Sequence, residues 1–352
     1  NHHGLMIAGE AALSNWDAGM DMYIYGKLGN LTMTKEGINV LMTNLTGKVP
    51  PILQRLDYIR FNGEAAGYLH DLTLTGLFHT GAGMVKTDVM MSIDEQSMSR
   101  TYSGSVASAD LDLGKLLNQE KKFGKVDFNV ELKGFNYKNR YPESYIKGII
   151  SSFEYSQYQY ENIMLDGVYK DGGFNGRLSM DDANGSVQID GNFNVAKTIP
   201  DFNLKASVKN LRPHDLHLSD KYENASISLG LTADFTGKSI DDMNGRISLD
   251  SLQLNAPDEG GCFLDNLTIT AGQVSGEKEL RINSSFMTAV IRGDYSYHTI
   301  PASVVKTVQR YIPSLLTIKD NMPEPHNNFQ FDICLENTEV LSKLFQIPLE
   351  LY

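Results

Sequence analysis

The chain has 352 residues, a formal net charge of −12 at pH 7 and a hydrophobic content of 41%. The negative charge argues against electrostatic binding to nucleic acid or to anionic membrane surfaces, and the hydrophobic content argues against a wholly disordered chain. No run of about 18 apolar residues occurs, so the sequence predicts no membrane-spanning helix. The chain begins NHHGLMIAGE, without an initiator Met or a signal-peptide pattern, and we therefore expect a fragment or a processed product.

Alternating apolar and polar residues predict β-strands from the first third of the chain onwards. DVMMSID, beginning at Asp88, and VDFNVELKG, beginning at Val126, each place apolar side chains on one face and polar side chains on the other. A helix of one or two turns is expected at 113–117, before the second of these strands.

A β-hairpin is predicted in the middle of the chain, in FNGRLSMDDANGSVQIDGNFNV from Phe174 to Val195. Asn184-Gly185 supplies the positive φ angles that a tight hairpin turn requires. The residues after the turn alternate, so that one face of the second strand is apolar and the other is polar.

The same alternation continues in FNLKASV from Phe202, in ASISLGLTADF from Ala225 and in NFQFDICL from Asn328. The main helical signal starts at Thr299, a residue that can cap a helix, with Pro301 at the first helical position. We expect this helix to pack on a sheet face or to plug one end of the sheet. A second short helix is expected at 338–345.

Motifs of known catalytic centres are absent: HExxH, GxSxG and GxGxxG do not occur. His214 and His217 have a spacing that can suit a metal, but they follow a strand and Pro213, and we interpret them as part of a solvated loop. The acidic pairs 181–182 and 241–242 fall in predicted turns, where Asp is favoured for backbone capping. The sequence therefore predicts no metal site, no cofactor and no enzyme.

Two cysteines, Cys262 and Cys334, are too few for a disulfide scaffold. We interpret them as buried free thiols, and a single disulfide between them stays open.

The sequence as a whole predicts an all-β protein with a long antiparallel sheet and one or two short amphipathic helices. Each strand must bury its apolar side. A long sheet curled lengthwise into a trough would leave a continuous apolar groove, and a lipid chain is the natural cargo of such a groove. We divide the chain into an N-terminal β-groove segment (1–110), a central repeating segment (111–298) and a helix with C-terminal strands (299–352).

Several stretches resemble the periplasmic TamB proteins of Bacteroidota, within the AsmA-like group of repeating β-groove proteins. They are DLGKLL, FGKVDFNVELKG, IKGIISSFEYSQYQYENIMLDGVYKDGGFNGRLSMDDANGSVQIDGNF, FNLKASVKNLRPHDLHL, TIPASVVKTVQRYIPSLL and NNFQFDICLENTEVLSKLF. The resemblance implies a β-taco groove in the periplasm and a full-length protein anchored in the inner membrane. It further implies transport of phospholipid to the outer membrane, support of outer-membrane biogenesis, and an outer-membrane assembly partner bound through a part outside this sequence. The family has no catalytic residues to carry over.

The residues that we expect to line the groove share one property, alternation on the apolar face of successive strands. They would solvate the acyl chains of phospholipid, the expected ligand. The alternative is that they form an ordinary dry core. They are Val187, Ile189, Phe193, Val195, Phe202, Leu204, Val208, Ile227, Leu229, Leu231, Ile247 and Leu249.

Three other functions stay open. A surface protein that binds glycan would use exposed tyrosines such as Tyr155, Tyr158 and Tyr160, because aromatic faces suit sugar rings. A polysaccharide-cleaving enzyme would need two carboxylates brought together by the fold. A structural spacer would need neither feature.

Overall fold

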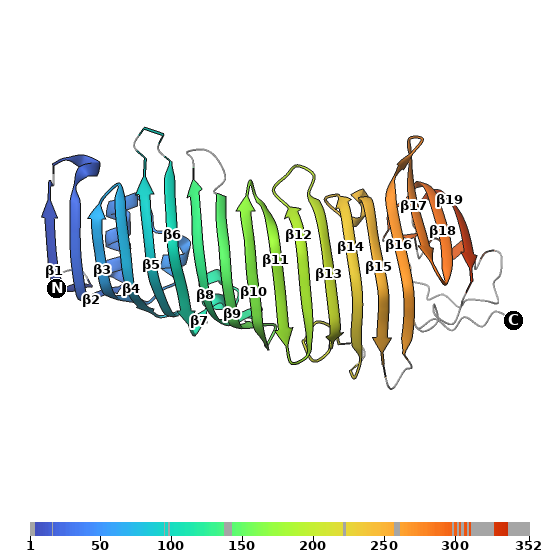
Figure 1. Ribbon diagram of the computed structural model, residues 1–352, viewed down its shortest axis with the longest axis horizontal. Coiled ribbons are helices and arrows are strands. Elements are labelled where there is room, and N and C mark those ends of the chain that lie inside the picture. The colour runs from blue at the N-terminus through green and yellow to red at the C-terminus, as the bar shows by residue number, and fades with distance from the viewer. Residues whose placement is uncertain are drawn as a thin grey trace. The chain divides into compact units, whose positions relative to one another are not determined.

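The computed structural model describes residues 4–336 except 16, 95, 98, 137–142, 221–222, 257–260, 298, 301–302, 304–305, 308–309 and 311–326. The predicted fold class is confirmed: antiparallel strands dominate the described residues, and the helices among them are few and short (Figure 1). None of these helices has the length and apolar composition needed to cross a membrane. The helix expected at 338–345 lies outside the described residues.

The chain divides into two compact units. Unit 1 comprises Asn1–Gln188 and His214–Asp220, and unit 2 comprises Ile189–Pro213 and Lys221–Tyr352. The three segments expected from the sequence stay a prediction.

Unit 1 is a sheet of antiparallel strands that pair in chain order, with β7 and β6 both paired to β8. The helix predicted at 113–117 is confirmed as α3. The elements are β1 (Leu5–Ser14), η1 (Gly19–Asp21), β2 (Tyr23–Thr34), α1 (Lys35–Thr46), α2 (Pro51–Gln54), β3 (Tyr58–Tyr68), β4 (Asp71–Thr80), β5 (Gly83–Ile93), β6 (Arg100–Ala109), β7 (Leu111–Asp112), α3 (Leu113–Leu117), β8 (Phe123–Asn136), β9 (Glu143–Tyr155), β10 (Tyr158–Lys170) and β11 (Gly173–Asp182).

Unit 2 repeats the arrangement, with β13 to β19 also paired antiparallel in chain order. Ile300 and Ser303 are helical, in agreement with the predicted helix. The Thr299 hydroxyl donates to Ser296 O at 3.0 Å, which is not the helix-capping contact that the sequence predicted. The elements are β12 (Gly185–Asn194), which begins in unit 1, β13 (Asp201–Leu211), β14 (Ser226–Thr236), η2 (Ile240–Asp242), β15 (Asn244–Asn255), β16 (Cys262–Val274), β17 (Glu277–Ser284), β18 (Met287–Asp294) and β19 (Asn328–Leu335).

The predicted hairpin is confirmed by β11 and β12, but its turn lies at Ala183-Asn184, one residue earlier than expected, and Gly185 is the first residue of β12. Asn184 does not adopt the positive φ that the sequence predicted for it. Gly185 has a φ of 130°, and the Asn184 N–H donates to Asp182 Oδ1 at 2.9 Å. Asp182 therefore caps the turn, as the sequence predicted for this acidic pair.

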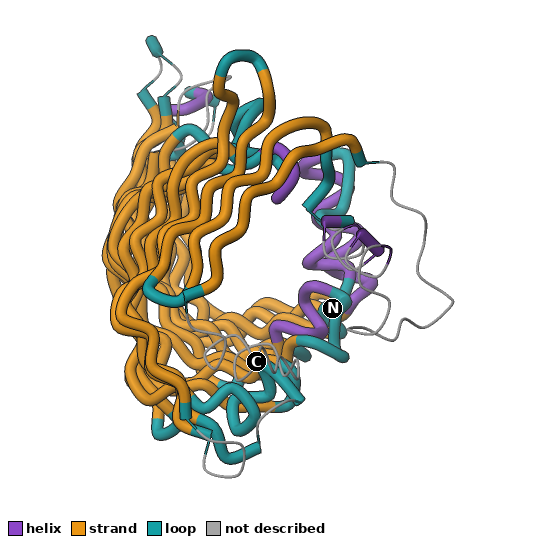
Figure 2. The backbone as a smooth tube through the Cα atoms, turned by 90° about the vertical axis from the view of Figure 1, so that its right-hand side faces the viewer, coloured by secondary structure: helices purple, strands orange, loops and turns teal. Residues whose placement is uncertain are grey.

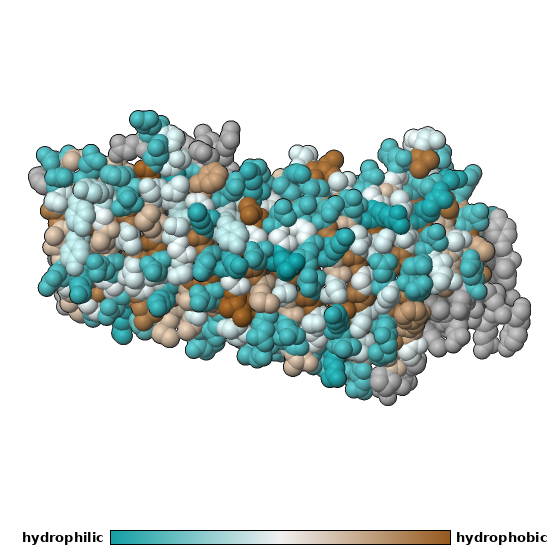
Figure 3. Space-filling view, viewed as in Figure 1, coloured by the Kyte–Doolittle hydropathy of each residue, from teal (hydrophilic) through white to brown (hydrophobic). Residues whose placement is uncertain are grey.

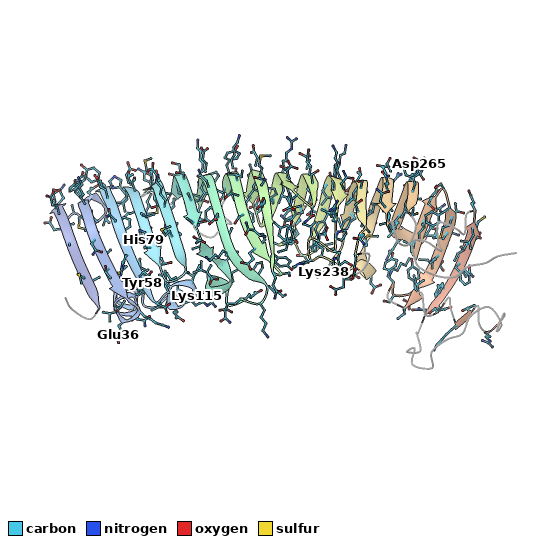
Figure 4. The ribbon with its side chains drawn as sticks, turned by 90° about the horizontal axis from the view of Figure 1, so that it is seen from below. Glu36, Tyr58, His79, Lys115, Lys238 and Asp265 are labelled. Atoms are coloured by element: carbon cyan, nitrogen blue, oxygen red, sulfur yellow. The ribbon has the colours of Figure 1, made fainter. Side chains whose placement is uncertain are left out.

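The two faces of each sheet differ in polarity. We name the face that carries Leu74, Val89 and Leu132 in unit 1, and Leu231 and Leu249 in unit 2, the inner face. The opposite, outer face is turned to the viewer in Figure 3, where hydrophilic side chains (teal) are common over both units. Helices α1 and α3 lie on the inner side of unit 1, where Figure 4 labels Glu36 and Lys115.

Glycines on the inner face allow the strands to bend. Gly104 of β6 has a φ of 142°, and a Cβ built there would lie 2.0 Å from Asp88 O. Gly245 of β15 has a φ of 143°, and its Cβ would lie 2.2 Å from Asp234 O. Glycine inside a strand commonly marks a bend or a close backbone approach, and Figure 2 shows strands that bend along their length.

The buried cores of the described residues are small and separate from one another. In unit 1, helices α1 and α3 close one end through a cluster that includes Ile38, Ile59 and Leu116. Helix α1 begins where the Thr34 side chain accepts the Gly37 N–H. Unit 2 has three smaller clusters, around Leu254, around Leu280 and around Leu264.

Candidate functional site

The candidate site is the inner face of strands β13, β14 and β15 in unit 2. The antiparallel register places Val208 opposite Leu229 and Leu231 opposite Leu249. Leu204 and Ile247 both face Ala233 of the strand between them. The structure thus brings together seven of the twelve predicted residues, which we name the open apolar face. They are Phe202, Leu204, Val208, Leu229, Leu231, Ile247 and Leu249.

Every inner-face position between these residues is also uncharged. Ala206 and Ala233 separate the larger side chains, and Phe202 stacks on Phe235 with ring centroids 4.7 Å apart. The charged side chains of the same strands, such as Lys205 and Asp234, alternate onto the outer face. The open apolar face can therefore contact an apolar ligand without desolvating a charge.

The open apolar face is only half-buried, although strands pair on both sides of β14. None of its seven residues belongs to a buried cluster of the described residues. By contrast Ile269, which pairs with Ile247 on the next strand, packs against the cluster around Leu280. Within unit 2, the open apolar face on β13 to β15 is thus uncovered, whereas Ile269 and the inner-face residues beside it on β16 to β18 pack into a buried cluster.

The remaining predicted residues have other surroundings. Ile227 is half-buried and packs against the buried cluster around Leu254, which is the environment that the dry-core alternative expects. Phe193 is 40% exposed, and Val195 lies beyond the end of β12 and is 60% exposed. Val187 and Ile189 are both half-buried on β12, Val187 in unit 1 and Ile189 in unit 2.

Unit 1 carries an equivalent surface that the list of predicted residues missed. Leu74 pairs with Val89, and Leu132 pairs with Ile146. These side chains, together with Leu165 of β10, are half-buried and lie outside the buried cluster of the unit. For Val89 and Leu132 the signal was present in the sequence, as the apolar alternation that predicted their two strands.

Helices close one end of the inner face in unit 1. The Lys115 ammonium on α3 donates to Asp57 Oδ2 at 2.6 Å and to Gly81 O at 3.0 Å. This hydrogen bond holds the pKa of the Asp57 carboxyl below its usual range. Arg55 also donates to Leu116 O. These contacts tie α3 to β3 and β4 at the strand ends (Figure 4).

The tyrosine cluster does not form the exposed sugar-binding platform that the glycan alternative requires. Tyr160 is only 8% exposed, and its hydroxyl donates to Leu216 O at 2.8 Å. The Tyr158 hydroxyl donates to Asp182 Oδ1 at 2.5 Å, and burial, followed by this hydrogen bond, raises the pKa of Tyr158 to about 12. Tyr155 is half-buried, and its ring is tilted by 51° against that of Phe123, with centroids 5.5 Å apart. The cluster closes an end of unit 1.

The histidines and cysteines form no centre in the described residues. His217 Nδ1 lies 2.9 Å from Ser156 O, and His214 Nδ1 lies 3.8 Å from Asp215 Oδ1. No group of three or more possible ligands that could hold a metal ion occurs in the part of the chain that the structure describes. Neither cysteine is part of a disulfide. Cys262 is buried, as predicted, but Cys334 is exposed, contrary to the prediction.

Comparisons with protein-family models, with curated proteins and with solved structures found no match to this chain.

Proposed function

We propose that the open apolar face binds the acyl chains of phospholipid and that this protein conducts phospholipid along a sheet with an apolar inner side. The observation that carries the proposal is the half-exposed, charge-free set of leucine, isoleucine, valine and phenylalanine side chains on β13 to β15. A contiguous apolar surface that a folded protein leaves exposed commonly marks a binding site.

The energetics favour a flexible apolar ligand. Each methylene group that leaves water contributes about 0.8 kcal/mol, without any requirement for direction. The small residues between the larger ones, such as Ala206 and Ala233, leave shallow spaces rather than one shaped pocket. Such a surface suits the variable conformations of acyl chains better than it suits a rigid ligand.

The cellular role follows from the resemblance to the TamB and AsmA-like proteins. In this proposal the chain works in the periplasm, as part of an envelope protein anchored in the inner membrane, and supports outer-membrane biogenesis. An outer-membrane assembly protein would be a partner of the full-length molecule. The protein acts by binding and needs no catalytic group.

Native mass spectrometry of the purified protein, followed by organic extraction, tests the proposal. We expect phospholipid at a reproducible stoichiometry. Leu229→Asp should remove most of it, because a carboxylate would have to be desolvated beside the acyl chains. Thr232→Asp is the matched control, since Thr232 lies on the same strand, is exposed and belongs to the outer face.

Two results would contradict lipid binding. One is a folded, lipid-free wild-type protein that also takes up no lipid from phospholipid vesicles, which would favour a structural spacer. The other is a Leu229→Asp variant with a wild-type circular dichroism spectrum and wild-type lipid content.

A further inference from the structure

A short segment after β18 covers part of the inner face of unit 2. Tyr295, Tyr297 and Ile300 pack against the cluster formed by Ala271, Leu280 and Ile291 on β16, β17 and β18. We name these three covering residues the tyrosine cover. Since Ile247 of the open apolar face pairs directly with Ile269, which also packs on this cluster, the cover begins where the open face ends.

The tyrosine cover is poorly suited to be a permanent core. The hydroxyls of Tyr295 and Tyr297 are buried and have no hydrogen-bond partner on any other described residue. They can share at most one hydrogen bond with each other, so at least one hydroxyl donor is unpaired. Burial is also the main reason that the pKa of each tyrosine is raised. A buried donor without a partner loses its hydrogen bonds to water, whereas phenylalanine would fill the same space without this loss. The hydroxyls therefore favour any state in which the cover is lifted and hydrated.

Polar contacts that water can replace hold the tyrosine cover in place. The Asp241 carboxylate accepts the Ser296 hydroxyl at 2.8 Å and the Tyr297 N–H at 2.5 Å. Lys278 Nζ donates to Tyr295 O at 3.0 Å and lies 4.5 and 4.4 Å from the ring centroids of Tyr295 and Tyr297. A cavity of about 650 Å³ is lined by Asp241, Lys278, Tyr295 and Ser296 among others, and the side chains of Lys278 and Asp241 are 23% and 33% exposed.

We propose that the tyrosine cover is a flap that an acyl chain displaces. The cover shields the apolar residues of β16 to β18 while no ligand lies there, and it lifts when an acyl chain extends from the open apolar face. When the cover is displaced, the apolar residues of β16 to β18 contact the acyl chain instead of the cover, and the hydroxyls of Tyr295 and Tyr297 return to water. This inference rests on the proposed lipid binding, and it adds that binding is regulated by a segment of the same chain.

Hydrogen exchange of the Tyr297 amide reports on the flap, because this N–H is bonded to Asp241 only while the cover is closed. The full chain is measured before and after incubation with phosphatidylethanolamine–phosphatidylglycerol vesicles, and bound lipid is counted by native mass spectrometry. We expect lipid to accelerate exchange at Tyr297. The double variant Tyr295→Phe, Tyr297→Phe should exchange about tenfold more slowly without lipid and should bind less lipid. Tyr25→Phe, on β2 in unit 1, is the control.

The outcomes separate the two proposals. Bound lipid with unchanged exchange at Tyr297 overturns the flap and leaves lipid binding intact. The absence of bound lipid overturns the proposed function, and with it displacement by lipid. The Tyr297 amide of the double variant could also exchange faster than in wild type, and as fast as in an Asp241→Ala variant. This result would show that the hydroxyls stabilise the closed cover, and it would overturn the flap.

Discussion

Leu231 of β14 lies directly opposite Leu249 of β15, and both side chains are half-buried outside every buried cluster of the described residues. Leu264 of β16, on the next strand, is only 2% exposed beneath Phe286. The same residue type thus has two environments on neighbouring strands. In the proposed function, this difference separates the lipid-binding surface from a dry core.

Leucine-to-alanine substitutions should separate these environments. Leu231→Ala and Leu249→Ala should each lower the free energy of unfolding by about 1 kcal/mol, because half-exposed side chains lose little on truncation. Leu264→Ala should lower it by about 2–5 kcal/mol, because it opens a cavity. Urea denaturation of the lipid-free proteins measures both. A cost at Leu231 equal to that at Leu264 would show that the open apolar face is a packed core.

The bend of β6 should depend on Gly104. Gly104→Ala forces a Cβ against Asp88 O at a φ of 142°, and we expect it to lower the free energy of unfolding by at least about 2 kcal/mol. Gly26→Ala on β2 is the control, since no atom lies within 4 Å of the added Cβ. Thermal denaturation compares the two. Equal and small effects would show that the strand does not need this backbone conformation.

Alkaline pH should destabilise unit 1 through Tyr158. The pKa of Tyr158 is raised from 10.0 to about 12 in the folded state, so between these values the folded protein holds a proton that the unfolded chain releases. The contribution to stability is therefore complete below pH 10 and is lost as the pH rises toward 12. Tyr158→Phe should flatten the fall in unfolding midpoint over this range. A Tyr158→Phe variant that follows the wild-type pH profile would contradict the raised pKa.

The two cysteines should react at different rates. Cys334 on β19 is exposed and Cys262 on β16 is buried, and neither is part of a disulfide. A thiol reagent at neutral pH should label Cys334 in seconds to minutes and Cys262 only when urea unfolds the protein. Mass spectrometry of the labelled peptides assigns the sites. Rapid labelling of Cys262 in the folded protein would show that the cluster around Leu254 is open.

The antiparallel sheet was predictable from the sequence because it depends on local information. Alternation with a period of two determines which side of a strand is apolar. The dipeptide Asn184-Gly185 indicates where the chain turns back. The position of Leu229, Leu231 and Leu249 on the apolar side of their strands follows from this pattern alone. The same pattern also occurs in unit 1, at Leu74 and Val89, although the predicted site did not include these two residues.

Which apolar residues stay open and which are covered was decided by the tertiary structure. Ile227, Leu229 and Leu231 follow the same alternation on β14, yet only Ile227 packs against a buried cluster. Likewise nothing local distinguished Tyr160, which a loop from far along the chain covers through Leu216. Burial depends on segments that are distant in sequence. Alternation therefore determines the apolar face of each strand, and long-range packing determines how much of that face remains for a ligand.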